Sequence, residues 1–292
     1  MRRRTSGVGR RAWDGEASLA EGSRRFLVRH PAGFAPGHTP ITTIDEAVDG
    51  TGMDFGVLVM RPGEVWASDP GLECALLLLS GEAEFTWDQG SAVARRTSLF
   101  DDAPATLHHA PGARATVRAR SASEMVVVRA PGSGRFETRF FGPADLVDLE
   151  DRDRDRWNGA SWRIVRTVFD TRNRPDAALV LGEVVNLPGR WSSYPPHHHP
   201  HPEVYHYRFD RPQGYGHAEL GDDVLKVRAF DTVKILDGRD HSQVAAPGYG
   251  MFYVWAIRHL PGNPYVIPEF TAEHRWLKEP GAEVWHPRGH GG

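Results

Sequence analysis

The chain has 292 residues, of which 40% are hydrophobic and 25% charged, a composition typical of a globular protein large enough for two domains of ordinary size. Its 35 basic and 38 acidic residues leave a formal net charge of −3, so we expect no general electrostatic attraction to nucleic acid or to an anionic membrane. The single cysteine, Cys74, excludes an intramolecular disulfide and any zinc module built on cysteines.

The N-terminal segment Met1–Gly7 is basic, but no apolar stretch follows it, so we do not expect a secretory signal peptide. No apolar run in the sequence approaches the roughly 18–20 residues of a membrane span. Together with the single cysteine, these features favour a cytoplasmic protein with no membrane partner. We expect residues 1–20 to be flexible.

Short segments rich in Val, Leu, Phe and Thr recur along the chain, and turns containing Gly and Pro separate them. This pattern is typical of an all-β sandwich or barrel. One short helix is expected, at Pro143–Leu149. The segments expected to form strands are Phe55–Met60, Ala75–Leu79, Ala83–Trp87, Ala115–Ala119, Met125–Arg129, Trp162–Phe169, Ala178–Asn186, Val204–Phe209, Val224–Val227, Asp231–Ile235 and Met251–Ile257.

The most polar stretch is Asp151–Arg156, in which acidic and basic residues alternate and nothing can be buried. We interpret it as a linker or a solvated edge that divides the chain into halves of similar length. The halves share a weak repeat, because Val59–Trp66 and Val185–Trp191 each carry a Pro-Gly turn after a strand. The sequence therefore predicts a duplicated β domain, with residues 21–150 in the first copy and residues 151–292 in the second.

The segment Trp191–Phe209 holds the densest group of histidines in the chain. On a strand, residues two apart face the same side, so His197 and His199 would point together. The two prolines that follow cannot donate to a sheet ladder, so the strand should end there. Glu203 then begins the next strand and can return its carboxylate to the same cavity.

A further ligand is expected from His241, which follows an Asp-Gly turn and enters a later strand. Three imidazoles and one carboxylate suit one divalent ion, zinc or manganese in the first place, with iron or nickel as alternatives. His201 is the main rival ligand, although the prolines on both sides count against it. A histidine run can also be a solvated loop, but the glutamate and the later histidine favour a site. His108 and His109 lack such partners, so we expect the first domain to hold no metal.

These residues carry a family resemblance. His-x-His-x-x-x-Glu, followed further along by Gly-x-x-His, resembles the paired motifs of the cupin superfamily. More narrowly, Trp191–His197, Tyr207–Gly214 and Ala245–Tyr249 resemble the 5-deoxy-glucuronate isomerases of bacterial myo-inositol catabolism. The chain departs from that family's pattern at His198–Pro202 and Ala256–Leu260, which leaves the metal ligands intact.

The resemblance implies two tandem cupin domains, each a double-stranded β-helix or jelly-roll barrel, with the metal site in the second. It also implies a metal-dependent aldose–ketose isomerase that converts 5-deoxy-D-glucuronate to 2-deoxy-5-keto-D-gluconate. Three alternatives share the fold: a pectin-pathway 5-keto-4-deoxyuronate isomerase, a metal cupin dioxygenase and a non-catalytic sugar-binding cupin.

Such an isomerase needs a group that moves a proton between adjacent carbons, close to a metal that acts as a Lewis acid. The sequence does not single out this group. Glu183, Tyr205 and Tyr253 are catalytic candidates, because their chemistry is suitable and they lie on strands near the metal segment. For each of them, an ordinary place in the strand is the alternative.

The carboxylate of a sugar acid needs a cationic partner, and the fork of an arginine suits it. Arg163 and Arg208 are candidates, with Arg166 and Arg211 as alternatives, although strand parity places Arg208 opposite Glu203. Gln213 could hydrogen-bond the hydroxyls of the sugar. The expected partners are therefore a small sugar-acid substrate and a second copy of the chain in a homodimer, because exposed edge strands often pair.

Overall fold

A computed structural model describes residue 22 and residues 25–288 of the chain. The prediction of a flexible segment at residues 1–20 lies outside the described residues. The all-β prediction is confirmed, because the described residues form 21 strands and only three short 3-10 helices. None of these helices is long and apolar enough to cross a membrane.

In chain order, the strands divide at η1. Those of the first half, with η1 between them and the second half, are β1 (Leu27–Val28), β2 (Gly37–Thr42), β3 (Asp54–Met60), β4 (Val65–Ala67), β5 (Glu73–Trp87), β6 (Gly90–Arg96), β7 (Thr106–His109), β8 (Ala115–Ala119), β9 (Ser123–Ala130), β10 (Arg139–Phe141) and η1 (Pro143–Asp145). The elements that follow are β11 (Asp148–Arg152), η2 (Trp157–Gly159), β12 (Arg163–Phe169), β13 (Leu179–Asn186), β14 (Trp191–His198), β15 (Glu203–Phe209), β16 (Tyr215–Leu220), β17 (Asp223–Arg228), β18 (Thr232–Ile235), β19 (His241–Ala245), β20 (Met251–Arg258), β21 (Glu269–Phe270) and η3 (Ala272–Lys278).

Every segment expected to form a strand overlaps one in the structure. Two of them, Ala75–Leu79 and Ala83–Trp87, are halves of the single long strand β5, which passes through Gly81. A Cβ atom at Gly81 would lie 2.3 Å from the carbonyl oxygen of Ala122, so only glycine fits this crossing. The helix expected at Pro143–Leu149 is wrong beyond its first turn, because the chain becomes extended there and pairs with β12.

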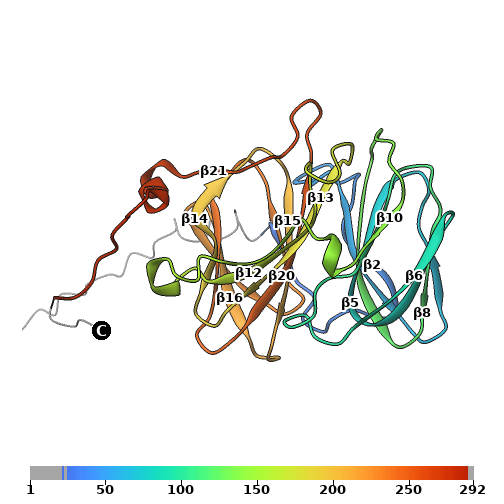
Figure 1. Ribbon diagram of the computed structural model, residues 1–292, viewed down its shortest axis with the longest axis horizontal. Coiled ribbons are helices and arrows are strands. Elements are labelled where there is room, and N and C mark those ends of the chain that lie inside the picture. The colour runs from blue at the N-terminus through green and yellow to red at the C-terminus, as the bar shows by residue number, and fades with distance from the viewer. Residues whose placement is uncertain (1–21, 23–24, 289–292) are drawn as a thin grey trace, which may run out of the picture.

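The strands form two lobes that lie side by side (Figure 1). In the first lobe, β2, β3, β9, β5, β7 and β10 form one layer, and β4, β8, β6 and the second half of β5 form the other. In the second lobe, a seven-stranded sheet (β1-β18-β15-β20-β13-β12-β11) faces a five-stranded sheet (β17-β16-β19-β14-β21). The repeat seen in the sequence spans β3 and β4 in one lobe and β13 and β14 in the other.

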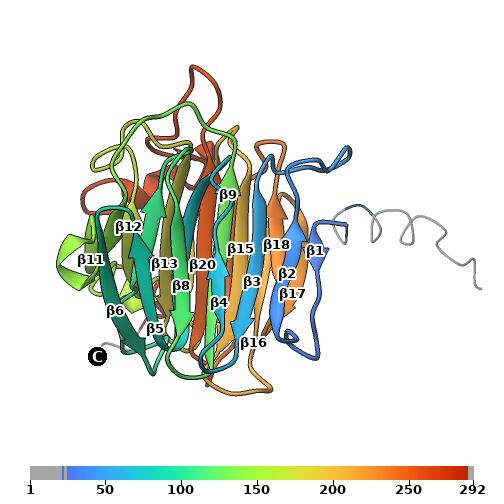
Figure 2. The same cartoon turned by 90° about the vertical axis from the view of Figure 1, so that its right-hand side faces the viewer.

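Each lobe has its own apolar core, and a third core lies between the lobes. The side chains of β5 point alternately into two of these cores. Leu76 and Leu78 lie in the core of the first lobe, whereas Leu77 and Leu79 lie in the core between the lobes, beside Val254 of β20. Figure 2 shows the strands of the first lobe in front of the large sheet of the second. Because these strands are buried on both faces, their sequences are continuously apolar.

The predicted domain boundary at residue 150 falls inside β11, which pairs along its whole length with β12 as the edge strand of the second lobe. The alternating charges of Asp151–Arg156 therefore lie at a sheet edge and in the turn after it, not in a free linker. Near the other end of the described chain, Leu27–Val28 also pairs with the second lobe, at β18. The first half of the chain therefore contributes its N-terminal strand to the second lobe.

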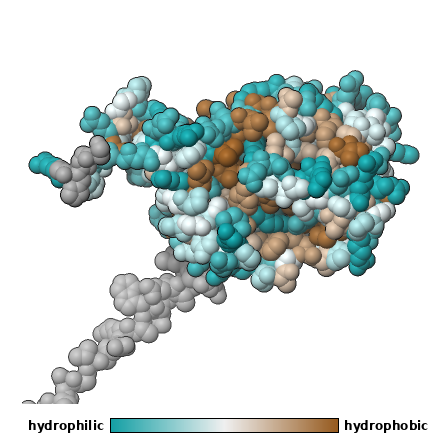
Figure 3. Space-filling view, turned by 60° about the horizontal axis from the view of Figure 1, so that its bottom comes forward, coloured by the Kyte–Doolittle hydropathy of each residue, from teal (hydrophilic) through white to brown (hydrophobic). Residues whose placement is uncertain are grey.

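The surface is mainly hydrophilic on the face that Figure 3 shows, and hydrophobic side chains gather there in a few patches. Large apolar side chains that are mostly exposed include Val266 and Ile267, in the segment that follows β20. This segment covers the second lobe without entering its core.

Two fully buried histidines in the layer between the lobes predict how stability depends on pH. His108 stacks on Phe169 with ring centres 4.0 Å apart, and His206 is hydrogen-bonded to Thr232 at 2.7 Å. Burial lowers the pKa of both imidazoles. Below about pH 6.5 the unfolded chain therefore binds protons that the folded chain does not, and the free energy of unfolding falls by up to about 1.4 kcal/mol per pH unit for each histidine.

Urea unfolding at pH 7.5, 6.5 and 5.5 measures this loss. His206→Gln should flatten the dependence, whereas His217→Gln, on the outward side of β16, should leave it unchanged. Stability that stayed constant down to pH 5.5 would contradict the prediction.

Candidate metal centre

Three buried side chains of the second lobe converge on one point. The ligand atoms of His199, Glu203 and His241 all lie within 4.8 Å of one another. β14 ends at His198 and β15 begins at Glu203, so the predicted strand, turn and strand are confirmed. His241 begins β19, which pairs with β14 and so brings the third side chain to the other two.

The two imidazoles of this triad are held in the tautomer that a metal ion needs. His199 Nδ1 lies 3.0 Å from the carbonyl oxygen of His201, and His241 Nδ1 lies 3.0 Å from that of Arg239. Each Nδ1–H can donate to its carbonyl, which leaves the lone pair on Nε2 for a ligand bond.

The Nε2 atoms face the carboxylate of the triad, at 3.1 Å from Glu203 Oε2 for His199 and 3.4 Å for His241. His241 Nε2 is buried and has no hydrogen-bond partner among the described residues. A buried polar atom in this situation requires an explanation, and a divalent cation held by two histidines and one glutamate provides it. The residues present therefore fit a metal ion.

The electrostatics agree with this donor set. Burial alone would raise the pKa of the Glu203 carboxyl, but its interactions with His199 and His241 outweigh burial and lower that pKa to about 2. The carboxylate is therefore ionised at neutral pH. Burial lowers the pKa of His197 well below the usual value, so this neighbouring ring is neutral.

The structure separates the remaining histidines of the run by their partners. His197 lines the same cavity, with its ring centre 4.5 Å from that of His241, but it lies outside the triad, so its role as a ligand stays a prediction. His201 Nε2 donates to the carbonyl of Asn263 at 2.8 Å. His198 Nδ1 lies 2.7 Å from Asp240 Oδ1. The rings of His198 and His201 therefore have hydrogen-bond partners away from the triad.

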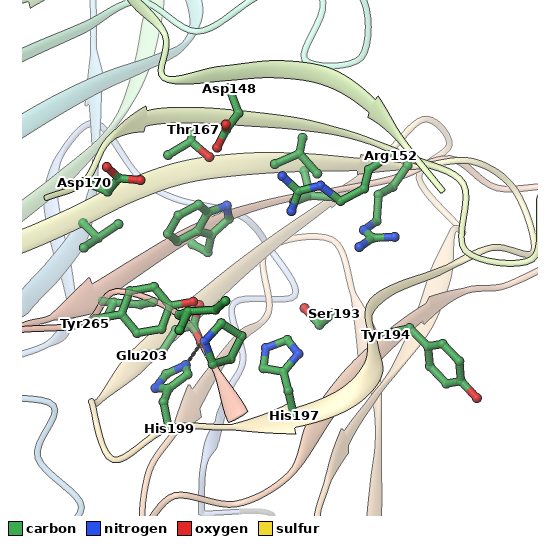
Figure 4. A pocket seen from close by; sticks show the side chains of 18 of the residues that line it. Asp148, Arg152, Thr167, Asp170, Ser193, Tyr194, His197, His199, Glu203 and Tyr265 are labelled. Carbon is green, nitrogen blue, oxygen red and sulfur yellow. Dashed lines mark hydrogen bonds and ion pairs between the residues drawn. The ribbon is translucent and has the colours of Figure 1, made fainter. Parts of the chain in front are cut away.

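A cavity of about 690 Å³ opens above the triad, a size typical of sites for small molecules. Figure 4 shows His197, His199 and Glu203 on one side of it, and Asp148, Thr167, Asp170 and Arg152 on the other. The second group comes from β11, β12 and the turn after β12. Charged side chains of both signs thus face the metal centre across the cavity.

Two of the three catalytic candidates reach this cavity. Tyr205 and Tyr253 line it, with ring centres 4.8 Å apart. The Tyr205 hydroxyl lies 3.1 Å from Ser193 Oγ, and the Tyr253 hydroxyl donates to Ser192 Oγ at 2.9 Å. Burial raises the pKa of both phenols, so they keep their protons at neutral pH and can act as donors.

The prediction for the third candidate, Glu183, is wrong. Its neighbour on β13, Val184, lines the cavity, so the side chain of Glu183 points to the opposite face of the sheet, toward the first lobe. There its carboxylate accepts hydrogen bonds from Arg96 at 2.6 and 2.9 Å and from Arg166 at 2.9 Å. The carboxylate is fully buried between the lobes and cannot reach a substrate.

Of the three residues predicted to bind substrate, only Arg163 lines the cavity. The side chain of Arg208 points away from the cavity, as strand parity predicts, and Arg208 Nη2 pairs with Glu124 of the first lobe at 2.5 Å. Gln213 lies in the exposed turn between β15 and β16 and does not line the cavity. The predictions for Arg208 and Gln213 are therefore wrong.

Several cavity residues escaped the sequence analysis, and one group of them lies in the irregular segment after β20. Tyr265 lines the cavity with its ring centre 4.9 Å from that of His199, and Phe270 and Lys278 line it as well. No hydrophobic period marks this segment, because it packs against the outside of the lobe. The only local signal is the turn sequence Leu260–Pro264, which indicates that the chain reverses before Tyr265.

Comparison with known proteins gives both a family and a fold. A family model described as the KduI/IolB family matches residues 26–277. A protein of Geobacillus kaustophilus (strain HTA426) named 5-deoxy-glucuronate isomerase is 28% identical over 270 residues, which cover 80% of this chain and 94% of that protein.

Two solved structures show the fold. An IolB-like protein from Salmonella typhimurium LT2 superposes with a TM-score of 0.77 at 21% identity, over 87% of this chain and 99% of that one. Oxalate decarboxylase of Bacillus subtilis, a cupin-type protein with Mn(II) centres, superposes with a TM-score of 0.55 at 11% identity, over 81% and 76% of the two chains. At these identities the likeness is one of fold alone, and that fold is of the cupin type.

Proposed function

Because the chain belongs to the KduI/IolB family, we propose that it is a metal-dependent aldose–ketose isomerase that converts 5-deoxy-D-glucuronate to 2-deoxy-5-keto-D-gluconate. One observation carries the proposal: the buried triad of His199, Glu203 and His241 lies at the wall of a cavity of about 690 Å³. The name of the Geobacillus kaustophilus relative supports the choice of substrate, because the match covers 94% of that protein.

The reaction moves one proton between adjacent carbons and another between their oxygens, and the weak acidity of the carbon beside the carbonyl is the obstacle. His199, Glu203 and His241, with His197 as a further donor, would hold a divalent ion, which would supply Lewis-acid stabilisation of the negative charge on those oxygens. We propose zinc or manganese, with iron or nickel as alternatives, because imidazole and carboxylate ligands accept all four.

The tyrosines of the cavity handle protons in this proposal. Tyr205 keeps its proton at neutral pH and can donate it to an oxygen of the sugar while Ser193 Oγ donates to the phenol. Tyr253 also keeps its proton, which it donates to Ser192 Oγ, so its oxygen can accept a hydrogen bond from a sugar hydroxyl. Ser193 and Ser192 hold the two hydroxyls in place. Trp255, which also lines the cavity, covers part of its wall with an apolar ring and limits the access of water.

Tyr205→Phe should lower kcat by about a hundredfold or more, because positioned acid–base groups contribute about that much. Metal content should not change, since the phenol is not part of the triad. Tyr215→Phe is the matched control, because Tyr215 lies on β16 and does not line the cavity. Unchanged kcat in Tyr205→Phe would remove this hydroxyl from proton transfer.

The proposed function is tested by incubating metal-analysed protein with 5-deoxy-D-glucuronate and following the products by NMR. Conversion to 2-deoxy-5-keto-D-gluconate is expected, with solvent deuterium in the product when the reaction is run in D2O. No conversion after loading with zinc, manganese, iron or nickel would overturn the isomerase assignment. Turnover of 5-keto-4-deoxyuronate, consumption of oxygen, or binding without turnover would instead select one of the three alternatives.

A further inference from the structure

The chain after β20 crosses the cavity and contributes to its wall. We call residues 259–278 the C-terminal strap. Within it, Tyr265 N–H donates to His259 Nδ1 at 2.9 Å. Farther along, β21 pairs with β14, and both the N–H and the hydroxyl of Thr271 donate to the carbonyl of Pro196 at 2.9 Å. The strap is therefore anchored to the strand that carries the histidine run, and its position relative to the metal centre is set by these bonds.

The strap ends in η3, whose last residue, Lys278, lines the cavity. Its Nζ atom lies 4.9 Å from the centre of the Phe270 ring, and no carboxylate of the described residues lies within ion-pair distance of it. Arg152 of β11 and Arg163 of β12 line the same cavity. Burial lowers the pKa of Lys278; Asp153 opposes this shift, and the nearby arginines add to it. Cationic side chains from β11, β12 and the strap thus line the cavity, together with acidic ones.

The acids that line this part of the cavity pair unequally with its cations. Arg163 Nη1 pairs with Asp153 at 2.7 Å, and both side chains are buried. Arg152 pairs with Glu150, two residues earlier on the same strand, and these side chains are 42% and 48% exposed. An ion pair that is so exposed contributes little and exchanges easily. Arg152 can therefore turn to an incoming anion at small cost, as Lys278 can.

Arg172 also lines the cavity, but it is not free to bind an incoming anion. Its guanidinium binds Asp148 at 2.8 Å and Asp170 at 2.6 Å, so two carboxylates already occupy its donors. Arg152, by contrast, faces Glu203 and its neighbours across open space (Figure 4). The cavity therefore has a metal-binding side and, across from it, a charged side on which Arg152 and Lys278 are the cations least committed to ion pairs.

We propose that Lys278 and Arg152, with Arg163 beside them, bind the carboxylate of the sugar acid and select acids over neutral sugars. The inference rests on the proposed function, in which the reacting carbons lie at the end of the molecule remote from the carboxylate. A substrate whose reacting end meets the triad directs its carboxylate across the cavity. Charge-assisted hydrogen bonds from the ammonium and guanidinium groups then hold it there.

The test uses full-length, metal-loaded protein and the variants Lys278→Gln and Arg152→Gln. Each should raise KM for 5-deoxy-D-glucuronate by about tenfold or more, because a hydrogen bond to a charged group is lost. The kcat should stay within a few-fold, since the carboxylate does not react. In calorimetric binding, the wild type should prefer D-glucuronate to the neutral D-glucuronamide by about tenfold or more, and Lys278→Gln should abolish this preference.

Arg275→Gln is the matched control. Arg275 lies on the same helix, is exposed, pairs with Glu269 and does not line the cavity, so its substitution should change neither KM nor the preference. Metal content should equal that of the wild type in all three variants. A wild type without preference for the acid, or variants that keep it, would overturn the carboxylate site even if isomerase activity is found. A preference that depends on Lys278 in a protein without turnover would uphold the site and overturn the isomerase.

Discussion

His241→Ala is expected to empty the metal centre and to abolish turnover. The Nε2 atom of His241 is buried, has no hydrogen-bond partner among the described residues and faces Glu203 Oε2 at 3.4 Å, as a metal ligand of this triad would. Loss of an outer partner of a metal ligand typically costs about ten- to a hundredfold in affinity, and loss of the ligand itself should cost more. Elemental analysis of the purified protein and a chelator competition measure the effect, and His199→Ala should behave in the same way.

Two neighbouring histidines give the control for that prediction. His201→Ala removes an imidazole but keeps the carbonyl that accepts from His199 Nδ1, so metal should be retained. His198→Ala removes only a partner of Asp240 and should also keep the metal. If His201→Ala empties the site, the assignment of the ligands is wrong. His197→Ala tests whether His197 is the fourth metal ligand, since loss of metal in this variant would show that it is.

Glu183→Ala is expected to destabilise the protein by about 3–5 kcal/mol, because it leaves the guanidinium groups of Arg96 and Arg166 buried without their counter-charge. Arg96 lies on β6 of the first lobe and Arg166 on β12 of the second, so the loss falls on the contact between the lobes. Urea unfolding measures it at pH 7.5. The folded fraction should keep its metal and a near-normal kcat, since Glu183 does not line the cavity.

A surface pair serves as the comparison for this loss. Glu82 pairs with Arg120 at 3.8 Å, with side chains 36% and 44% exposed. Glu82→Ala should therefore change the free energy of unfolding by less than about 1 kcal/mol. If Glu183→Ala instead lowered kcat strongly at unchanged stability, Glu183 would return as a catalytic residue and the structural argument against it would fail.

The site predictions that succeeded rest on constraints between neighbouring residues, and the one for Glu183 lacked such a constraint. His199 and Glu203 were found because Pro200 and Pro202 end one strand and delay the next, a constraint written in neighbouring residues. Glu183 was misplaced because every residue of β13 is buried, so no alternation of polar and apolar residues tells which face of the strand meets the cavity.

Local irregularity hid other parts of the site. The pairing of β14 with β19 shifts register between Ser192 and His197, and Ser193 has a positive φ of 52°. The two adjacent serines consequently both reach tyrosine hydroxyls, which simple alternation along a strand would forbid. Strand parity applied to Ser192 and Ser193 would have placed one of them on the wrong side.

The sequence by itself determined the all-β class and the histidine and glutamate pattern of the candidate metal centre. Both are local or periodic properties, because turn residues and alternation act over a few neighbours. Only the tertiary structure decided which charged residues face the cavity. It buried Glu183 and Arg208 between the lobes, and it brought Arg152 and Lys278 to one wall. These are contacts between segments far apart in the chain, and packing of whole sheets and of the C-terminal strap selects them.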